Sequence, residues 1–476
     1  MKQSFFSVIL IVVLLAFTSK GMTQGPLTLK QCIETGIANN LDVLQRELQS
    51  QSDRANWKQS RLNVFPDLNA NAGHSFNQGR SIDPYTNSPI TQSFNSSSYG
   101  ISSNVVLFNG LAIHHNTKQN ALTYQAASME WQQEKDNLTI NIILAYLQVL
   151  SNADQLEQAR NQHALSGKQV ERLQVLNDQG AVRPSLLSDL KGQLAGDQLA
   201  IINAQNSLET SKVNLSRLMN VPYNKDINLE KILPESFAAT YESAPDSIYQ
   251  AALENLALIK AVDLRKQSAA RGVKVARGQL WPTLSFGGSA STRYSSVARQ
   301  NQYVNTVYGP TSDSAIINNV RYPVFSYQDK FTDLTKIGYM DQLDNNLYTS
   351  FGFNLSIPIF NSLVQRNRVK QAGIRLRSAE LVANTTRTQL SQDIELAFVN
   401  MTSAADRYKV LLEQVSAFDE SFRAAGILFQ QGVGTSIDYL TAKNNLDRAS
   451  INLIIARYDY VLRMKILDYY QGKQLW

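Results

Sequence analysis

The stretch Phe108-Asn109-Gly110-Leu111 returns 252 positions later as Phe360-Asn361-Ser362-Leu363. The same spacing then continues toward the C-terminal end of both copies without a gap. Further matches at this spacing are Gln119 with Gln371, Ala145 with Ala397, Gln179-Gly180 with Gln431-Gly432, and Leu194 with Leu446. A period this long exceeds the 20 to 50 residues of a solenoid repeat, so it marks a duplicated half-protein. Each half should therefore contain the same structural parts.

The N-terminus is typical of a secretory signal peptide, which we assign to residues 1–23. Met1-Lys2 precedes an apolar run from Val8 to Phe17 that is too short for a permanent membrane helix. We therefore expect the chain to leave the cytoplasm.

The single cysteine, Cys32, lies inside the first helical pattern, where we interpret it as a core thiol. One cysteine can form neither an intrachain disulfide nor a metal cluster.

Composition excludes some functions. The formal charge is +6, and the basic residues are scattered rather than clustered on one face, so nucleic-acid binding has little support. Beyond the signal, no apolar run approaches the roughly 20 residues of a transmembrane helix. We therefore expect any embedding in a membrane to involve strands.

The first helical pattern of each half ends at a proline. In the first half it occupies residues 24–65, with Thr28 as a possible N-cap, and Pro66 ends it. In the second half it occupies residues 247–281 and ends at Pro282. Within these patterns Asn255-Leu256 is aligned with Asn40-Leu41.

After each proline the apolar period changes from helical to two, which is typical of strands. We predict a β-hairpin over 66–108 with an external loop at 79–98, and a second over 282–360 with an external loop at 297–347. Each strand has about 10 residues, enough to cross a bilayer at a tilt. The alternative is a pair of hairpins that are half-buried on a soluble domain. The Tyr-rich segment 297–347 is expected to lack secondary structure, because the extracellular loops of membrane strands are the long ones.

Each hairpin of strands is followed by a helical hairpin. These cover residues 109–220, with a tip near 180–185, and residues 361–472, with a tip near 432–436. About 69 residues of uninterrupted helix would reach roughly 100 Å, which is too long for a compact domain. Residues 221–246 connect the two halves, and the family resemblance described below implies that they form an equatorial segment.

Four strands per chain are too few for a closed membrane barrel, because the smallest have about 8. The chain must therefore share its barrel with other copies. Two copies would give 8 strands and a filled interior, whereas three would give 12 strands and room for a lumen. A conduit favours three copies.

These features resemble the TolC family of outer-membrane channel proteins, and the resemblance covers nearly the whole mature chain. It rests on the order and duplication of several segments: Leu27 to Asn40, the boundaries at Pro66 and Pro282, Leu107-Phe108-Asn109-Gly110, Pro358-Ile359-Phe360-Asn361, and the tip from Gln431 to Leu440. It implies an α+β membrane protein that forms a homotrimer. Three chains would share one 12-stranded β-barrel in the outer membrane of a Gram-negative bacterium, continued by a periplasmic α-helical barrel. A mixed belt would be built from Pro222 to Pro245 together with the chain termini.

The resemblance also implies a function. Such a channel is the exit duct of a tripartite efflux or type I secretion system, and its partners are a periplasmic adaptor protein and, through it, an inner-membrane pump. The exported substrate, a small molecule or a polypeptide, is left open. Two alternatives remain at this point, a secreted long-helix structural or adhesive surface protein and a passive outer-membrane pore.

The resemblance places an acidic aperture at the tip of the tunnel. Asp438 matches an acidic residue that family members carry at the constriction, where three copies would form a carboxylate ring that selects cations. A second acidic position of the family is Thr441 here, and Asp189 stands at its duplicated place. The alternative is that Asp438 is an ordinary acid in the first turn of a helix, which the helix dipole favours.

The two tip turns are the expected surface for the adaptor. Their residues are Gly180, Arg183, Pro184 and Ser185 in the first half, and Gly432, Gly434, Thr435 and Ser436 in the second. The alternative for the glycines is a simple helix cap.

We predict no catalytic, cofactor-binding or metal-binding residues, since the sequence has no phosphate loop or nucleophile motif, and the adjacent His114-His115 do not share a helix face.

Overall fold

The computed structural model describes residues 26–83, 87–232, 244–331, 335–473 and 475. The predicted signal peptide and part of the predicted equatorial segment lie outside the described residues. The chain divides into two compact units. The first comprises Met1–Arg54, Ala121–Gln267 and Arg377–Trp476, and the second comprises Ala55–Asn120 and Ser268–Leu376.

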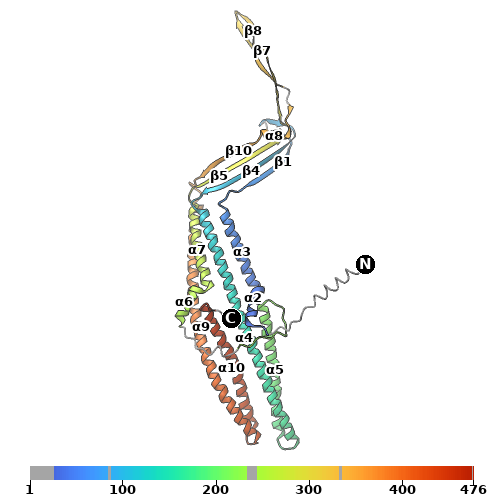
Figure 1. Ribbon diagram of the computed structural model, residues 1–476, viewed down its shortest axis with the longest axis vertical. Helices are drawn as coiled ribbons and strands as arrows, with labels where there is room; N and C mark the ends of the chain where they lie inside the picture. The colour runs from blue at the N-terminus through green and yellow to red at the C-terminus, as the bar shows by residue number, and fades with distance from the viewer. Residues whose placement is uncertain (1–25, 84–86, 233–243, 332–334, 474, 476) are drawn as a thin grey trace, which may run out of the picture. The chain divides into compact units, whose positions relative to one another are not determined.

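The first unit is helical. Its helices form two antiparallel hairpins, α4 with α5 and α9 with α10, and Figure 1 shows each pair side by side. The helix bounds are α2 (Leu29–Asn39), α3 (Leu41–Leu62), α4 (Ala112–Asp178), α5 (Pro184–Leu218), α6 (Pro245–Asn255), α7 (Ala257–Gly278), α9 (Val364–Gln430) and α10 (Ser436–Tyr470). One end of each of α3, α4, α7 and α9 belongs to the second unit. The duplication is therefore visible in the bounds. α2 and α3 recur as α6 and α7 after 216 positions, and α4 and α5 recur as α9 and α10 after 252 positions.

The first helix of each half is broken, where the sequence predicts one continuous helix over 24–65 and another over 247–281. The breaks fall at Asn40 and Leu256, which both have extended backbone angles. Asn40 stabilises its break, because its Oδ1 accepts hydrogen bonds from the backbone N–H groups of Asp42 and Val43. The structure also shifts the sequence alignment by one residue, since Asn40 corresponds to Leu256 rather than to Asn255. At the start of α2, the predicted N-cap Thr28 is confirmed as part of a capping box with Gln31.

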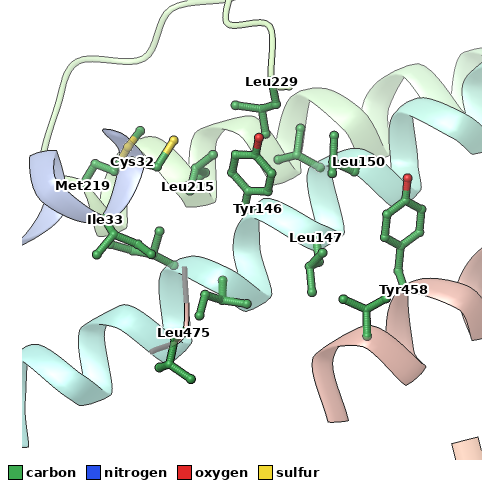
Figure 2. Close-up of a cluster of buried hydrophobic side chains, with 14 of the residues drawn as sticks. Cys32, Ile33, Tyr146, Leu147, Leu150, Leu215, Met219, Leu229, Tyr458 and Leu475 are labelled. Carbon is green, nitrogen blue, oxygen red and sulfur yellow. The ribbon is translucent and has the colours of Figure 1, made fainter. Parts of the chain in front are cut away.

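A buried apolar cluster in the first unit surrounds Tyr146 of α4 (Figure 2). The hydroxyl of Tyr146 lies within hydrogen-bond distance of the carbonyl oxygens of Leu27 (3.1 Å) and Glu230 (2.7 Å). Leu27 also forms a parallel bridge with Leu229. The N-terminal segment and residues near 229 thus join the helices here, in the described part of the predicted belt.

Cys32 lies in the same cluster, with 1% of its surface exposed. Burial raises the pKa of its thiol to about 11, so the thiol stays protonated at neutral pH. The position equivalent to Cys32 in the second half is Ile248, which is also fully buried. The interpretation of Cys32 as an apolar core residue is therefore confirmed.

The second unit contains a four-stranded antiparallel sheet in the order β1-β4-β5-β10. Its strands are β1 (Asn69–Asn77), β4 (Phe94–Phe108), β5 (Thr283–Ser295) and β10 (Tyr348–Ser356). The two predicted strand hairpins are thus β1–β4 and β5–β10, and the β4–β5 pairing joins them (Figure 1).

The register of the sheet separates an apolar face from a polar one. Phe353 lies opposite Phe286, Leu355 lies opposite Leu284, and Phe286 also lies opposite Val105 on its other side. Because directly opposed residues share a face, these side chains form one apolar surface. Small and polar side chains alternate with them on the other face: Ser285, Gly287, Ser289, Ser350, Gly352 and Asn354.

The segment between β5 and β10 corrects the prediction of an unstructured loop over 297–347. It contains β6 (Arg299–Gln300), β7 (Tyr303–Ile317), β8 (Val320–Phe331), β9 (Thr335–Lys336) and the short helix α8 (Tyr339–Asn345). β7 and β8 form a long hairpin, and β6 pairs with β9. Asn318 and Asn319, both with positive φ, form the two-residue turn that such hairpins require. The shorter predicted loop, 79–98, contains β2 (Arg80–Ile82) and β3 (Pro89–Thr91), and β4 already begins within it.

The repeated Phe-Asn motif is the junction from strand to helix. Gly110 and Leu111 both have a φ of 62°, and the equivalent Ser362 and Leu363 have φ values of 53° and 62°. A Cβ atom on Gly110 would lie 2.3 Å from the carbonyl oxygen of Gly278. The two backbone segments therefore approach too closely there for any residue but glycine. Throughout the described ranges, no helix combines the length and apolarity needed to cross a membrane.

Candidate functional site at the helical tips

The predicted tip turns lie at equivalent places in the two helical hairpins of the first unit. The first connects Asp178 to Pro184, and the second connects Gln430 to Ser436. Gly180 and Gly432 have φ values of 71° and 76°, which favour glycine at the end of a helix. Both glycines are therefore helix caps, as the alternative interpretation proposed, and both are exposed.

The returning helices begin differently. α5 begins with Pro184 at its first position, and the N-cap residue Arg183 makes no side-chain capping bond. α10 begins with a capping box, in which Asp438 N donates to Thr435 Oγ1 (3.2 Å) and Thr435 N donates to Asp438 Oδ2 (3.3 Å). Thr435 Oγ1 also donates to Asp438 Oδ2 at 2.7 Å. The carboxylate of Asp438 thus stabilises the start of α10.

An apolar cluster holds the two tips together. Its buried members are Leu173, Leu187, Leu190 and Tyr439. The ring of Tyr439 stacks on that of Phe429, with ring centroids 4.9 Å apart, and contacts Phe422 with centroids 5.4 Å apart. Since Leu173, Leu187 and Leu190 come from the first hairpin and Tyr439 from the second, the tips form one packed structure.

The packed tips enclose a cavity of about 600 Å³ that is open to solvent. Seven residues that the sequence predicts for the tip site line this cavity: Arg183, Ser185, Asp189, Gly432, Gly434, Thr435 and Ser436. The other four, Gly180, Pro184, Asp438 and Thr441, are exposed but do not line it. Asp189 therefore faces a different part of the tip surface from Asp438.

Close to the tips lies a buried charged cluster that the sequence reasoning missed. Lys443 of α10 is 1% exposed, and its ammonium group lies 3.1 Å from Asp197 Oδ2 and 2.7 Å from Asp447 Oδ2. Asp197, on α5, also accepts hydrogen bonds from Ser166 of α4 and from Gln193. One cluster thus connects three helices of the two hairpins.

The charges in this cluster do not balance, because two carboxylates share one ammonium group. Burial raises the pKa of Asp447, although the hydrogen bond and positive charge of Lys443 lower it in part. Burial and the nearby carboxylates of Asp447 and Asp197 raise the pKa of Tyr439 to about 12. The sequence contains a weak signal for this cluster. Tyr439, Lys443 and Asp447 recur at helical spacing, on the helix face that also carries the buried Ala442.

A second charged group lies around Asp154 of α4, whose equivalent after 252 positions is Asp406. Its carboxylate pairs with Arg457 and with Lys231, 3.3 Å away, and accepts a hydrogen bond from the Tyr458 hydroxyl at 2.8 Å. The equivalent Asp406 is exposed. Among the described residues, no group of three His, Cys, Asp or Glu side chains could hold a metal ion.

Two long helical hairpins, a sheet with one apolar face, and exposed tips define the architecture of an outer-membrane efflux channel. A family model described as outer membrane efflux protein matches residues 32–221 and 248–468, which make up most of the sequence. The chain therefore belongs to the outer membrane efflux protein family. This confirms the resemblance to TolC.

Individual relatives agree with this assignment. The outer membrane protein TolC of Vibrio cholerae is 23% identical over 338 residues, which cover 71% of this chain and 68% of that protein. The solved structure of CusC, described in terms of transmembrane channel formation, has a TM-score of 0.74 at 16% identity and covers 95% of this chain and 96% of its own. The CmeC outer membrane channel of Campylobacter jejuni has a TM-score of 0.73 at 14% identity, covering 96% of this chain and 90% of its own.

The family establishes location and function. The chain lies in the outer membrane and serves as an exit duct for efflux. The alternatives of a secreted structural or adhesive surface protein and of a passive pore are not favoured, and these matches indicate no enzyme family.

Proposed function

We propose that three copies of this chain form one channel, in which their sheets close into a 12-stranded barrel and their helices continue it as a periplasmic tunnel. The observation that carries the proposal is the sheet itself. Its order leaves β1 and β10 as edge strands, and each pairs with one neighbour within the described residues. A sheet in a membrane must close to satisfy its edges, and four strands cannot close alone.

The two faces of the sheet support this arrangement. Phe351, Phe353 and Leu355 of β10 expose 83%, 71% and 59% of their surface and lie on the apolar face. Lipid would cover that face, whereas the Ser, Asn and Gly side chains of the other face would line a wet interior. Three sheets give 12 strands, which leave room for a lumen.

The exposed tips are the proposed docking surface for a periplasmic adaptor, which connects the channel to an inner-membrane pump. Arg183, Ser185, Gly434, Thr435 and Ser436 offer backbone and polar groups around the tip cavity. In-cell photo-crosslinking from position 436 tests the proposal, and capture of a periplasmic adaptor is the expected result. Recovery of no periplasmic partner, with the channel present in the outer membrane, would contradict the docking surface.

We also propose that Asp438 contributes to a carboxylate ring at the aperture, with Thr441 on the same helix and with Asp189 as a second candidate from the other tip. Three exposed copies would raise the local cation concentration. Asp438→Ala is therefore expected to reduce cation selectivity in planar bilayer recordings. Because Asp438 also caps α10, the matched control is Thr435→Ala, which removes the same capping box and keeps the charge. Unchanged selectivity in Asp438→Ala, or an equal loss in Thr435→Ala, would contradict the ring.

A further inference from the structure

Four segments of the second unit, at the ends of the long helices, are basic and contain no acidic residue. These segments are residues 55–66, 109–120, 268–281 and 361–376. Together they contain ten Lys and Arg residues, here called the basic band: Lys58, Arg61, Lys118, Arg271, Lys274, Arg277, Arg366, Arg368, Lys370 and Arg375. The four segments are far apart in the sequence, but they belong to one compact unit of the structure.

The basic band recurs at equivalent positions of the two halves. Lys58 corresponds to Lys274 and Arg61 to Arg277, both after 216 positions, and Lys118 corresponds to Lys370 after 252 positions. Lys58 and Arg61 are three residues apart, so they lie on the same side of α3, and their equivalents share one side of α7 in the same way. Such like charges repel one another, which favours a bound anion.

Among the described residues, no carboxylate forms a salt bridge with a side chain of the band. All ten side chains are at least partly accessible, and nine are exposed. Within the described ranges, every salt bridge of the protein lies in the first unit and none involves the band. The band also affects its neighbours, since burial and then the charges of His114, Lys274, Arg271 and Lys118 lower the pKa of His115.

The band lies where the helices meet the sheet. α3 ends at Leu62 and α7 at Gly278, and each is followed within a few residues by a strand. Between helix and strand stand Phe65 and Trp281, which are equivalent after 216 positions and expose 67% and 62% of their surface. Exposed aromatic rings at the end of membrane strands are typical of the headgroup level of a bilayer. Arg61 and Arg277 precede these rings by about one helical turn, roughly 6 Å.

We propose that the basic band binds the phosphate groups of anionic phospholipids in the periplasmic leaflet of the outer membrane. Guanidinium and ammonium groups bind phosphate, and basic segments next to a membrane are attracted to anionic lipid. A lipid fits better than a soluble anion, because the band is continuous with the aromatic junction and with the apolar face of the sheet. The inference depends on the proposed placement of the sheet in the membrane.

The test uses the full-length channel in detergent, titrated with phosphatidylglycerol or with zwitterionic phosphatidylcholine and observed by native mass spectrometry. The protein should bind phosphatidylglycerol preferentially, and added salt should weaken this binding. The variant Lys58→Gln, Arg61→Gln, Lys274→Gln, Arg277→Gln should bind phosphatidylglycerol at least about tenfold more weakly, since each basic residue near anionic lipid contributes to the attraction.

A matched control removes the same number of charges elsewhere. Arg160→Gln, Lys168→Gln, Lys409→Gln and Arg423→Gln change exposed residues of the first unit that form no salt bridge with a described residue, and this variant should keep its lipid binding. The double variant Lys58→Arg, Lys274→Arg keeps the charge and should also bind. Equal affinity of the wild type for the two lipids, or an equal loss in the control variant, would overturn the inference.

Flotation with lipid vesicles separates this inference from the proposed function. A channel that enters vesicles and shows no preference for phosphatidylglycerol contradicts the lipid site alone. A channel that does not enter vesicles of either composition contradicts the placement of the sheet in the membrane.

Discussion

The strand-to-helix junction shows how a single residue of the repeat differs between the halves. Gly110 and Ser362 are equivalent and both have positive φ, and Gly110 lies against Gly278. A Cβ at position 110 would also lie 2.7 Å from Cβ of Trp281. The first copy therefore requires glycine at this junction, whereas the second copy accommodates a side chain.

We predict that Gly110→Ala lowers the stability of the folded channel by about 1–3 kcal/mol or more, the usual cost of overpacking with added backbone strain. Thermal unfolding followed by circular dichroism would measure the effect. Ser362→Ala is the matched control, because it changes the equivalent position without adding a new Cβ, and it should leave the melting temperature nearly unchanged. Equal melting temperatures for the two variants would contradict the close approach between Gly110 and Gly278.

At the scale of elements, the buried cluster around Lys443 links α4, α5 and α10. Removing one partner of a buried ion pair leaves an uncompensated charge, which is more costly than losing an exposed pair. Lys191 occupies the equivalent position in the first half, yet it is exposed and donates a hydrogen bond to Gln174 at 2.9 Å. The duplication thus provides an internal comparison of a buried and an exposed lysine.

Lys443→Met is expected to destabilise the tip region by about 3–5 kcal/mol, because Asp197 and Asp447 lose their counterion. Hydrogen exchange with mass spectrometry should show faster exchange in α5 and α10. The control Lys191→Met should have little effect on hydrogen exchange in α5 and α10. Similar protection in both variants would show that the buried pair does not hold the hairpins together.

The raised pKa of Asp447 predicts a pH dependence of stability. A carboxyl group whose folded-state pKa is raised binds its proton more tightly when folded. The contribution of Asp447 to the free energy of unfolding is therefore largest at a pH below its ordinary pKa of 3.8. This contribution is lost as the pH rises through the raised pKa of the folded state. Relative to Asp447→Asn, the wild type should gain stability as the pH is lowered from neutral toward 4, which denaturant midpoints across this range would measure. A constant difference between the two proteins would contradict the raised pKa.

The sequence predicts elements well where local chemistry decides them. No proline interrupts α4 or α9, and both duplicated turns carry glycine, so their positions follow from the residues alone. The break at Leu256 has no such signal, since leucine favours helices and the break comes from packing of α6 and α7 on their neighbours. The β7–β8 hairpin was missed because its polar and tyrosine-rich composition is also typical of loops. The charged partners of Lys443 come from α5 as well as from α10, so helical periodicity within one segment could not identify them.

At the scale of the whole molecule, the duplication gives each chain two nearly equivalent helical hairpins and two strand hairpins. The cores correspond, since Leu138, Ile142 and Leu215 of one half recur as Leu390, Ile394 and Leu467 of the other, and all six are buried. The differences concentrate at the tips and in the segment between β5 and β10. In a closed assembly of three chains, six similar units would alternate around the channel, so the tips would alternate between a capping box and an uncapped start.

The proposed trimer predicts which strands of neighbouring copies meet. Cysteines introduced on the edge strands, with Ala72→Cys on β1 and a scan of positions 351 to 355 on β10, should form disulfides between chains in at least one pair. Native Cys32 should not interfere, because it is buried and its pKa is raised to about 11. Oxidation in outer membranes should produce a covalent ladder that ends at three chains on a non-reducing gel.

Val105→Cys with Phe286→Cys is the control, since these residues lie opposite each other within one sheet and should link only within a chain. A ladder that ends at two chains would indicate an 8-stranded barrel, and no ladder at any pair would contradict closure through β1 and β10.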